Sequence, residues 1–260
     1  MLIDTHSHLF DEAFETDRPE TIRRAKEAGI GRILSPAIDS SSHEALFALC
    51  RTWPGYCLPM MGLHPTSVND LPNWRDELEL VKRYLSDPPA GAFCAVGEVG
   101  LDLYWDKNHL REQTEALEKQ IEWSLEYDLP LAIHTRDAWP EMVALLEKYR
   151  GTSIRGVMHA FAESEETYLR VKECGDFLFG IGGTVTFKKS ILAETLPRMS
   201  LDDLVLETDS PYLTPVPYRG KRNESSYLTF IRDRVAALMA RTPEEVERCT
   251  TENARRMFGC

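Results

Sequence analysis

Five of the seven histidines in this chain close or directly follow a short apolar run. These are His6, His8, His64, His134 and His159. His6 and His8 stand two residues apart, so on a strand their side chains project from one face and can reach the same metal ion. Asp4 precedes them on that face, where it could orient one of the imidazoles. Because neutral imidazole is a common ligand of zinc and other transition metals, the pattern predicts a metal site.

Two carboxylates occupy similar positions at the ends of apolar runs. Glu98 ends the run that begins at Phe93, and Asp209 closes the run that begins at Leu204. A carboxylate placed there needs a partner, because burying an unpaired charge is costly. Glu207 lies two residues before Asp209 on the same face, so the two carboxylates would repel each other unless cations or basic groups lie between them.

The candidate ligands form a set that is too large for one ion. They are His6, His8, Glu98, His134, His159 and Asp209. A single tetrahedral zinc uses fewer donors, so we expect two divalent cations (Mg²⁺, Zn²⁺ or Mn²⁺) bridged by Glu98. The first two histidines and Asp209 would complete one ion, and His134 and His159 the other. Such a centre activates water for hydrolysis, with Asp209 orienting the water and accepting its proton. Glu98 and Asp209 are therefore the predicted catalytic carboxylates.

The elements that must position these residues alternate along the whole chain. Eight apolar strand candidates are separated by amphipathic stretches with helical periodicity. The strand candidates are Leu2–His6, Arg32–Ala37, Leu58–His64, Phe93–Glu98, Leu131–His134, Ile154–His159, Phe177–Gly182 and Leu204–Asp209. This order predicts an α/β fold, a (β/α)₈ TIM barrel, whose active site lies at the carboxyl ends of the strands. An open doubly wound sheet is the alternative, but no glycine-rich phosphate loop follows an early strand.

Length and composition are compatible with one such barrel. The chain has 260 residues, and barrels of this kind typically need about 250, so we expect a single domain over residues 1–260. The net charge of −12 argues against an extended grip on duplex DNA. The six cysteines form no C-x-x-C pair and are expected to be free thiols. No apolar run is long enough to cross a membrane, and we expect a cytoplasmic protein with no obligate protein partner.

The motifs resemble those of the TatD family of metal-dependent deoxyribonucleases, which belongs to the amidohydrolase-like barrel enzymes. The matching stretches occur in family order and extend over nearly the whole chain. They are residues 4–9 (DTHSHL), 62–65 (GLHP), 97–102 (GEVGLD), 134–138 (HTRDA), 156–161 (GVMHAF), 207–213 (ETDSPYL), 219–224 (RGKRNE) and 251–254 (TENA). Two positions depart from the family pattern: Ala160 stands where cysteine is usual, and Ser225 where proline is frequent.

The resemblance implies a binuclear Mg²⁺- or Zn²⁺-type centre that hydrolyses phosphodiester bonds in DNA. It implies 3′→5′ exonuclease action on single-stranded or damaged DNA, with a single-strand end as the substrate. It also implies a set of substrate-binding residues, with His64 and Arg136 on the phosphate and the loop around residue 219 at the mouth. The substrate-binding candidates are His64, Arg136, Glu207, Arg219 and Lys221.

Two features near the expected mouth have more than one interpretation. Arg219, Lys221 and Arg222 are either contacts to a DNA backbone or an ordinary solvated basic run. Tyr104 or Trp105, just beyond Glu98, either stacks on a base or packs the loop against the barrel.

Two other functions are compatible with the same ligand set. A small-molecule amidohydrolase or lactonase could use this barrel, because a fold does not determine the substrate. Those relatives often bridge their metals with a carboxylated lysine, so Glu98 favours the nuclease. A non-catalytic metal-binding scaffold would leave Asp209 and His64 without a role.

Overall fold

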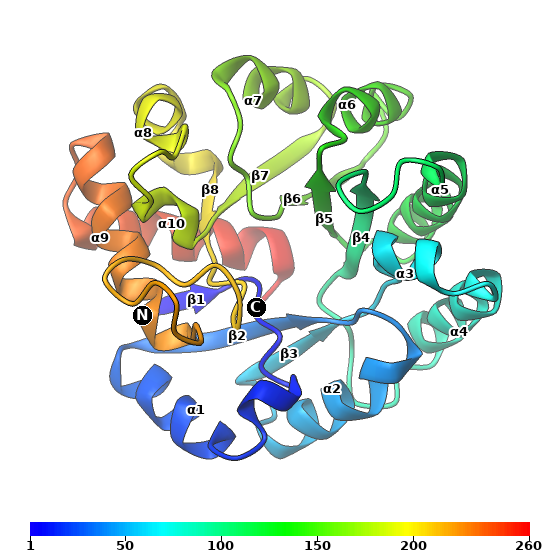
Figure 1. The fold of residues 1–260 in the computed structure, drawn as a ribbon, viewed down its shortest axis with the longest axis horizontal. Coiled ribbons are helices and arrows are strands. Elements are labelled where there is room, and N and C mark those ends of the chain that lie inside the picture. Colours follow the sequence, from blue (N-terminus) through cyan, green and yellow to red (C-terminus); the bar gives the residue numbers. More distant parts are fainter.

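The computed structural model describes residues 1–260 as an α/β structure, a (β/α)₈ TIM barrel of parallel strands ringed by helices (Figure 1). All eight predicted strands are present. Their bounds are β1 (Leu2–Asp4), β2 (Ile30–Pro36), β3 (Cys57–Met60), β4 (Val96–Asp102), β5 (Leu131–Arg136), β6 (Arg155–Met158), β7 (Asp176–Ile181) and β8 (Leu204–Leu206).

The helices lie between and after these strands. They are α1 (Arg18–Glu27), α2 (Ser40–Thr52), α3 (Pro65–Asp70), α4 (Trp74–Ser86), α5 (Leu110–Glu126), α6 (Trp139–Glu147), α7 (Glu165–Lys172), α8 (Leu192–Thr195), α9 (Leu228–Met239) and α10 (Pro243–Phe258). Short 3₁₀ turns are η1 (Glu12–Phe14), η2 (Gly183–Thr186), η3 (Leu196–Arg198), η4 (Leu201–Asp203) and η5 (Ser225–Tyr227). The α10 helix begins with a capping box in which Thr242 caps the helix and Glu245 reaches back to it.

The barrel closes at two places where the regular ladder is interrupted. Strands β1 to β3 form one regular sheet and β4 to β8 another, both parallel throughout. The amide of Gly97 donates to the carbonyl of Met61 at 3.0 Å, which joins β4 to the end of β3. The amide of Thr5 donates to the carbonyl of Leu206 at 3.1 Å, which joins β1 to β8. The carboxyl ends of all eight strands therefore surround one opening.

One strand boundary differs from its prediction in a way that matters for the site. The fourth strand was expected to end at Glu98, but β4 continues to Asp102. It continues because β5 extends equally far, and Asp102 pairs with Arg136 in the parallel ladder. Glu98 therefore lies within a fully buried strand.

The interior of the barrel is apolar at the end opposite the opening. Each of the eight strands contributes one residue to this cluster, in β4 the residue just before the strand begins, and α10 contributes the remaining three. The members are Ile3, Leu34, Met60, Ala95, Ala132, Val157, Leu178, Val205, Ala254, Met257 and Phe258. Figure 1 shows α10 passing behind the strands. We call this buried apolar cluster the floor of the barrel. It fills the barrel interior beneath the polar side chains at the opposite end.

Residues two positions further along several strands project above this floor. His134 follows Ala132, His159 follows Val157, and Glu207 follows Val205, each pair on one strand face.

No helix in the structure is long and apolar enough to span a membrane. All six cysteines are free, as expected.

Candidate metal centre

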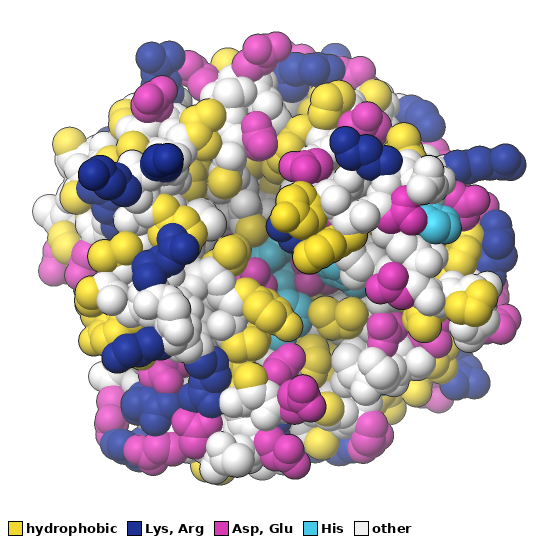
Figure 2. All heavy atoms as spheres, in the orientation of Figure 1, with side chains coloured by type: hydrophobic (Ala, Val, Ile, Leu, Met, Phe, Trp, Pro, Cys, Tyr) yellow, Lys and Arg dark blue, Asp and Glu magenta, His cyan; other side chains and the backbone are white.

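Glu98 occupies the middle of a buried cluster of imidazoles, in a hollow where histidine side chains are visible from outside (Figure 2). One carboxylate oxygen, Oε2, lies 3.2 Å from Nε2 of His6 and 3.7 Å from Nε2 of His8. Both histidines come from the segment that leaves β1. The two histidines that were predicted to share a metal ion therefore face the same carboxylate oxygen.

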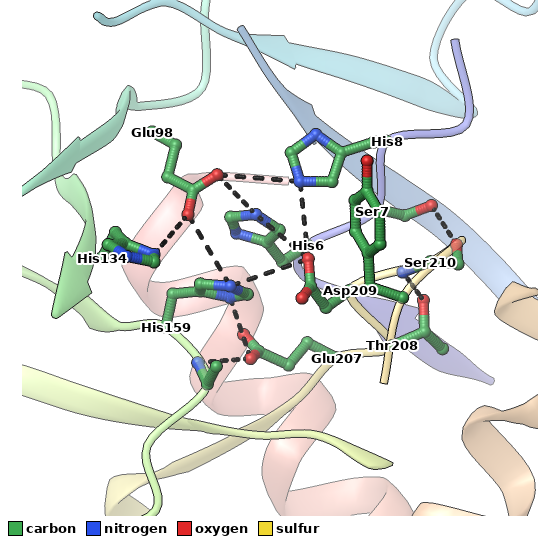
Figure 3. A network of polar contacts seen from close by, with 12 residues as sticks. His6, Ser7, His8, Glu98, His134, His159, Glu207, Thr208, Asp209 and Ser210 are labelled. Atoms are coloured by element: carbon green, nitrogen blue, oxygen red, sulfur yellow. Dashed lines mark hydrogen bonds and ion pairs between the residues drawn. The ribbon is translucent and has the colours of Figure 1, made fainter. Parts of the chain in front are cut away.

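The other oxygen of Glu98 faces a second group of imidazoles. Oε1 lies 3.1 Å from Nδ1 of His134, 3.5 Å from Nε2 of His64 and 3.7 Å from Nε2 of His159. His134 lies in β5, whereas His64 and His159 follow β3 and β6. One carboxylate therefore presents its two oxygens to two separate sets of nitrogen donors (Figure 3).

Asp209 approaches the same space from the end of β8. Its Oδ1 lies 3.4 Å from Nε2 of His8, 3.7 Å from Nε2 of His159 and 3.9 Å from Nε2 of His6. The backbone of Asp209 is left-handed, with φ of 56°, a conformation that aspartate tolerates better than most residues. Its amide donates to the carbonyl of His6 at 2.9 Å, which holds the two metal-ligand candidates together.

Three groups of donors are close enough to hold an ion. They are His6, His8 and Asp209; His6, Glu98 and His159; and His64, Glu98 and His134. All six predicted ligands lie in these groups. His64, expected only on the substrate side, lies there as well, and no group pairs His134 with His159. The rings of His6 and His159 stack with centroids 3.5 Å apart, so the two halves of the cluster are continuous.

Glu207 lies beneath this cluster and does not reach the mouth. Its side chain has no exposed surface, and Oε1 accepts a hydrogen bond from the amide of Ala160 at 2.6 Å. The same oxygen lies 2.9 Å from Nδ1 of His159. Glu207 was predicted to bind substrate, but the structure places its carboxylate behind His159 and out of contact with solvent. Its position suits orientation of the His159 ring.

Asp102 has the corresponding position behind His134, and sequence reasoning assigned it no role. Its Oδ2 lies 3.0 Å from Nε2 of His134, whose Nδ1 faces Glu98. The signal that could have identified it is its spacing. Asp102 follows Glu98 by four residues on a continuous apolar strand, so its buried carboxylate needs a partner.

The Asp4 carboxylate forms no hydrogen bond with an imidazole, contrary to the expectation. Its carboxylate accepts hydrogen bonds from the amide of Thr208 at 2.9 Å and from the Thr208 hydroxyl at 2.6 Å. Complete burial raises the pKa of Asp4 to about 7, although hydrogen bonds oppose that shift. Asp4 therefore joins β1 to the segment that carries Asp209.

His64 is held by the helix that follows it. Its Nδ1 accepts a hydrogen bond from the amide of Thr66 at 3.2 Å and so caps the first turn of α3. This contact leaves Nε2 directed at Glu98. The short α3 helix was not predicted, because six residues are too few to establish a helical periodicity.

Burial and charge oppose each other throughout the cluster. Burial disfavours ionisation of Glu98, but His6 and His64 outweigh it and hold the pKa of Glu98 well below its usual value. Burial also opposes protonation of His159, but the charges of Glu207 and Asp209 outweigh it and raise its pKa to about 10. Without a cation, a proton on His159 compensates part of the buried negative charge.

The donors present suit divalent cations. Imidazole nitrogens and carboxylate oxygens converge in one buried space, and this mixed set is typical of zinc and manganese. Nδ1 of His8 is buried without a hydrogen-bond partner, and its Nε2 faces both Glu98 and Asp209. The alternative of ordinary core histidines would leave these nitrogens competing for two carboxylates, so a cation site is the better physical account.

The remaining substrate-binding candidates lie on the exposed rim. The guanidinium of Arg136 lies 3.7 Å from the centre of the Tyr104 ring, and that of Arg219 lies 3.8 Å from the centre of the Phe187 ring. Lys221 is exposed as well. Arg222, in contrast, donates hydrogen bonds to both carboxylate oxygens of Asp17. This member of the basic run therefore links the loop after β8 to Asp17.

The two departures from the family pattern involve residues that are not among the predicted ligands. Ala160 follows His159, and its backbone amide donates a hydrogen bond to the Glu207 carboxylate. Ser225 is completely buried at the start of η5. Neither side chain replaces a predicted ligand.

Comparisons with known proteins agree along the whole chain. A family model described as TatD related DNase matches residues 3–259. YabD of Bacillus subtilis, described as an uncharacterized metal-dependent hydrolase, is 36% identical over 261 residues, covering 99% of both chains. A protein of Pectobacterium parmentieri named 3′-5′ ssDNA/RNA exonuclease TatD is 31% identical over 264 residues and is covered to the same extent.

Solved structures show the same architecture. The crystal structure of YjjV, a TatD homologue from Escherichia coli K12, matches with a TM-score of 0.91 at 27% identity, covering 100% of this chain and 98% of that chain. A phosphotriesterase homology protein from Escherichia coli matches with a TM-score of 0.67 at 13% identity, which reflects the fold alone.

Proposed function

Because this chain belongs to the TatD-related DNase family of metal-dependent hydrolases, we propose that it cleaves phosphodiester bonds at the 3′ end of single-stranded nucleic acid. DNA, intact or damaged, is the substrate we expect first. In this proposal, residues 1–260 act as one catalytic domain that uses two divalent cations.

The position of Glu98 carries the proposal. Its two oxygens face different sets of imidazoles, His6 with His8 on one side and His134 with His159 on the other. A bridging carboxylate of this kind suits a pair of cations better than one. His64, 3.5 Å from Glu98, is available either as a further donor or as a contact to the substrate phosphate.

Divalent cations, when bound, neutralise phosphate charge and lower the pKa of water. Asp209 is the residue we assign as base, because its Oδ1 faces the same donors and its carboxylate is among the more exposed in the cluster. Burial opposes its ionisation, but His159 outweighs this and lowers the pKa of Asp209, so it is a carboxylate at neutral pH. Glu207 and Asp102 hold the rings of His159 and His134 from behind.

Basic side chains at the mouth of the barrel support a nucleic-acid substrate. Lys188, Lys189 and Arg219 line a cleft of about 520 Å³ formed by loops that follow β6, β7 and β8. None of these three side chains, nor that of Lys221, is within ion-pair distance of a carboxylate. The chain as a whole has a net charge of −12. Four basic side chains without an acidic partner at one rim therefore favour a polyanionic strand over a small neutral molecule as the substrate.

The direct test uses purified protein supplied with Mg²⁺, Mn²⁺ or Zn²⁺ and a 5′-labelled single-stranded DNA. We expect a ladder of products shortened from the 3′ end that EDTA abolishes. Duplex, abasic and RNA substrates of equal length define the preference. Turnover of lactones or amides with no action on any nucleic acid would favour the small-molecule hydrolase instead.

A further inference from the structure

Two aromatic side chains stand exposed at the start of the loop between β4 and α5. Trp105 is 70% exposed and Tyr104 is 51% exposed. The Tyr104 ring contacts Arg136 of β5, whereas most of the Trp105 ring faces solvent. Two large adjacent rings left in water are unusual, because each would gain free energy by covering its surface.

The pair has a defined geometry that leaves the indole available. The two rings meet edge to face, with centroids 4.9 Å apart at 89°. The guanidinium of Arg136 covers Tyr104 at 3.7 Å but lies 5.6 Å from the Trp105 ring. Tyr104 is thus engaged by both neighbours, whereas Trp105 keeps most of its surface open.

This loop is joined directly to the metal centre. The amide of Tyr104 donates to Oδ1 of Asp102 at 2.9 Å, and Oδ2 of the same carboxylate lies 3.0 Å from His134. Trp105 follows Asp102 by three residues, which places their Cα atoms within about 10 Å of each other. The rim of the hollow in Figure 2 includes hydrophobic side chains beside the histidines.

We propose that Trp105 stacks on the nucleobase at the strand end, with Tyr104 and Arg136 holding the indole in place. This inference rests on the proposed nuclease function and names how the strand end is held. Stacking tolerates every base, because each has a π-face. Arg136 keeps a positive charge beside the ring, where a phosphate of the same strand would lie.

A nucleobase fits this feature better than a protein partner. Specific protein interfaces bury about 800 Å² on each partner, whereas two adjacent side chains present only a fraction of that area. One base covers one indole face. The expected consequence is that the enzyme distinguishes a strand end that carries a base from one that does not.

The test measures binding in EDTA, which prevents turnover. Fluorescence anisotropy compares two 5′-fluorescein single-stranded decamers, one with a normal 3′ nucleotide and one with a tetrahydrofuran abasic residue there. The wild-type protein is expected to bind the base-bearing end about tenfold more tightly, Trp105→Ala to bind both alike, and Trp105→Phe to retain most of the difference. Leu169→Ala, which removes an exposed apolar side chain from α7, is the matched control and should behave like wild type.

Turnover with metal restored separates the two proposals. Trp105→Ala is expected to raise KM for single-stranded DNA with kcat largely retained. If nucleotides are released but neither the affinity ratio nor KM changes in Trp105→Ala, the stacking role is overturned and the nuclease function stands. If the wild-type protein degrades no nucleic acid, the proposed function fails. Equal wild-type affinity for the two decamers also overturns the stacking role.

Discussion

Oε1 of Glu207 lies 2.9 Å from Nδ1 of His159, below the candidate metal centre and out of contact with solvent. The opposite nitrogen of the same ring, Nε2, faces Glu98 and Asp209 at 3.7 Å each. A buried carboxylate behind an imidazole fixes the ring orientation and strengthens it as a donor. We therefore expect Glu207 to act on the centre through His159.

Glu207→Gln is expected to weaken metal binding by about 10- to 100-fold with the fold retained, because the substitution removes the charge but keeps the size. Titration calorimetry with Mn²⁺ or Zn²⁺ measures the affinity. Glu77→Gln is the matched control, since Glu77 is also buried and accepts from the Ser40 amide at 2.8 Å outside the centre. Unchanged metal affinity in Glu207→Gln would show that His159 does not depend on this carboxylate.

Gly180 leaves the space that Glu207 occupies. A Cβ atom at position 180 would lie 2.1 Å from Oε2 of Glu207, whereas the nearest atom to one at position 182 would be Oε1 at 3.7 Å, an ordinary contact distance. Gly180→Ala should therefore displace Glu207, cost about 1–3 kcal/mol in unfolding free energy and lower metal affinity. Gly182→Ala, two residues along the same segment, should be tolerated. Thermal unfolding and metal titration of the two variants test this, and similar behaviour of both would contradict it.

Asp209→Asn is expected to lower turnover by about 10²- to 10⁴-fold, because asparagine cannot accept the proton of the attacking water. Circular dichroism should be unchanged. The control is Asp176→Asn, at the opposite end of the barrel, where Asp176 pairs with Arg256 at 2.8 Å. A turnover rate close to that of the wild type in Asp209→Asn would remove Asp209 from the chemistry.

Metal binding should release protons. With no cation present, Glu207 and Asp209 outweigh burial and raise the pKa of His159 to about 10, so its ring is protonated at neutral pH. A ligand nitrogen must be deprotonated, so metal affinity is expected to rise with pH over the whole range below that pKa. Calorimetry in two buffers of different protonation enthalpy counts the protons. Equal heats in both buffers at pH 7 would contradict a protonated His159.

The ion pair between Asp17 and Arg222 should make stability depend on acid pH. Hydrogen bonds from Arg222 lower the pKa of Asp17 to about 2, below its ordinary 3.8. The stabilisation is therefore fully present above about pH 4 and is lost as the pH falls through 2. Because the Asp17 side chain is 35% exposed, Asp17→Asn should cost about 1 kcal/mol or less at pH 6. Denaturant unfolding at pH 6 and pH 2.5 should show the difference shrinking at the lower pH.

Much of this fold and site follows from local patterns. Apolar runs bounded by amphipathic stretches predicted all eight strands, because buried parallel strands and surface helices have different periodicities. His6, His8, His134 and His159 were recognisable because a polar residue at a strand end faces the mouth of a barrel. Short elements such as α3 were missed, because they contain too few residues to form a pattern.

The tertiary structure decided which carboxylate lies beside which histidine. Glu207 and Asp209 look equivalent in sequence, yet one lies beneath His159 and the other faces the opening. Asp102 meets His134 only because β4 and β5 run side by side to the same length. These contacts join residues far apart in the chain, and barrel closure determines which of them meet.

The exposed rim was decided in the same way. Sequence alone left Trp105 equally suited to packing and to stacking, and left Arg222 grouped with Arg219 and Lys221. The fold leaves Trp105 in solvent and brings Asp17 to Arg222 from 205 residues away. Residue type and spacing determined which side chains could bind metal, because direction along a strand is a local property. Which groups are buried, paired or free depends on the closed barrel, because only closure brings the distant strand ends and their loops together.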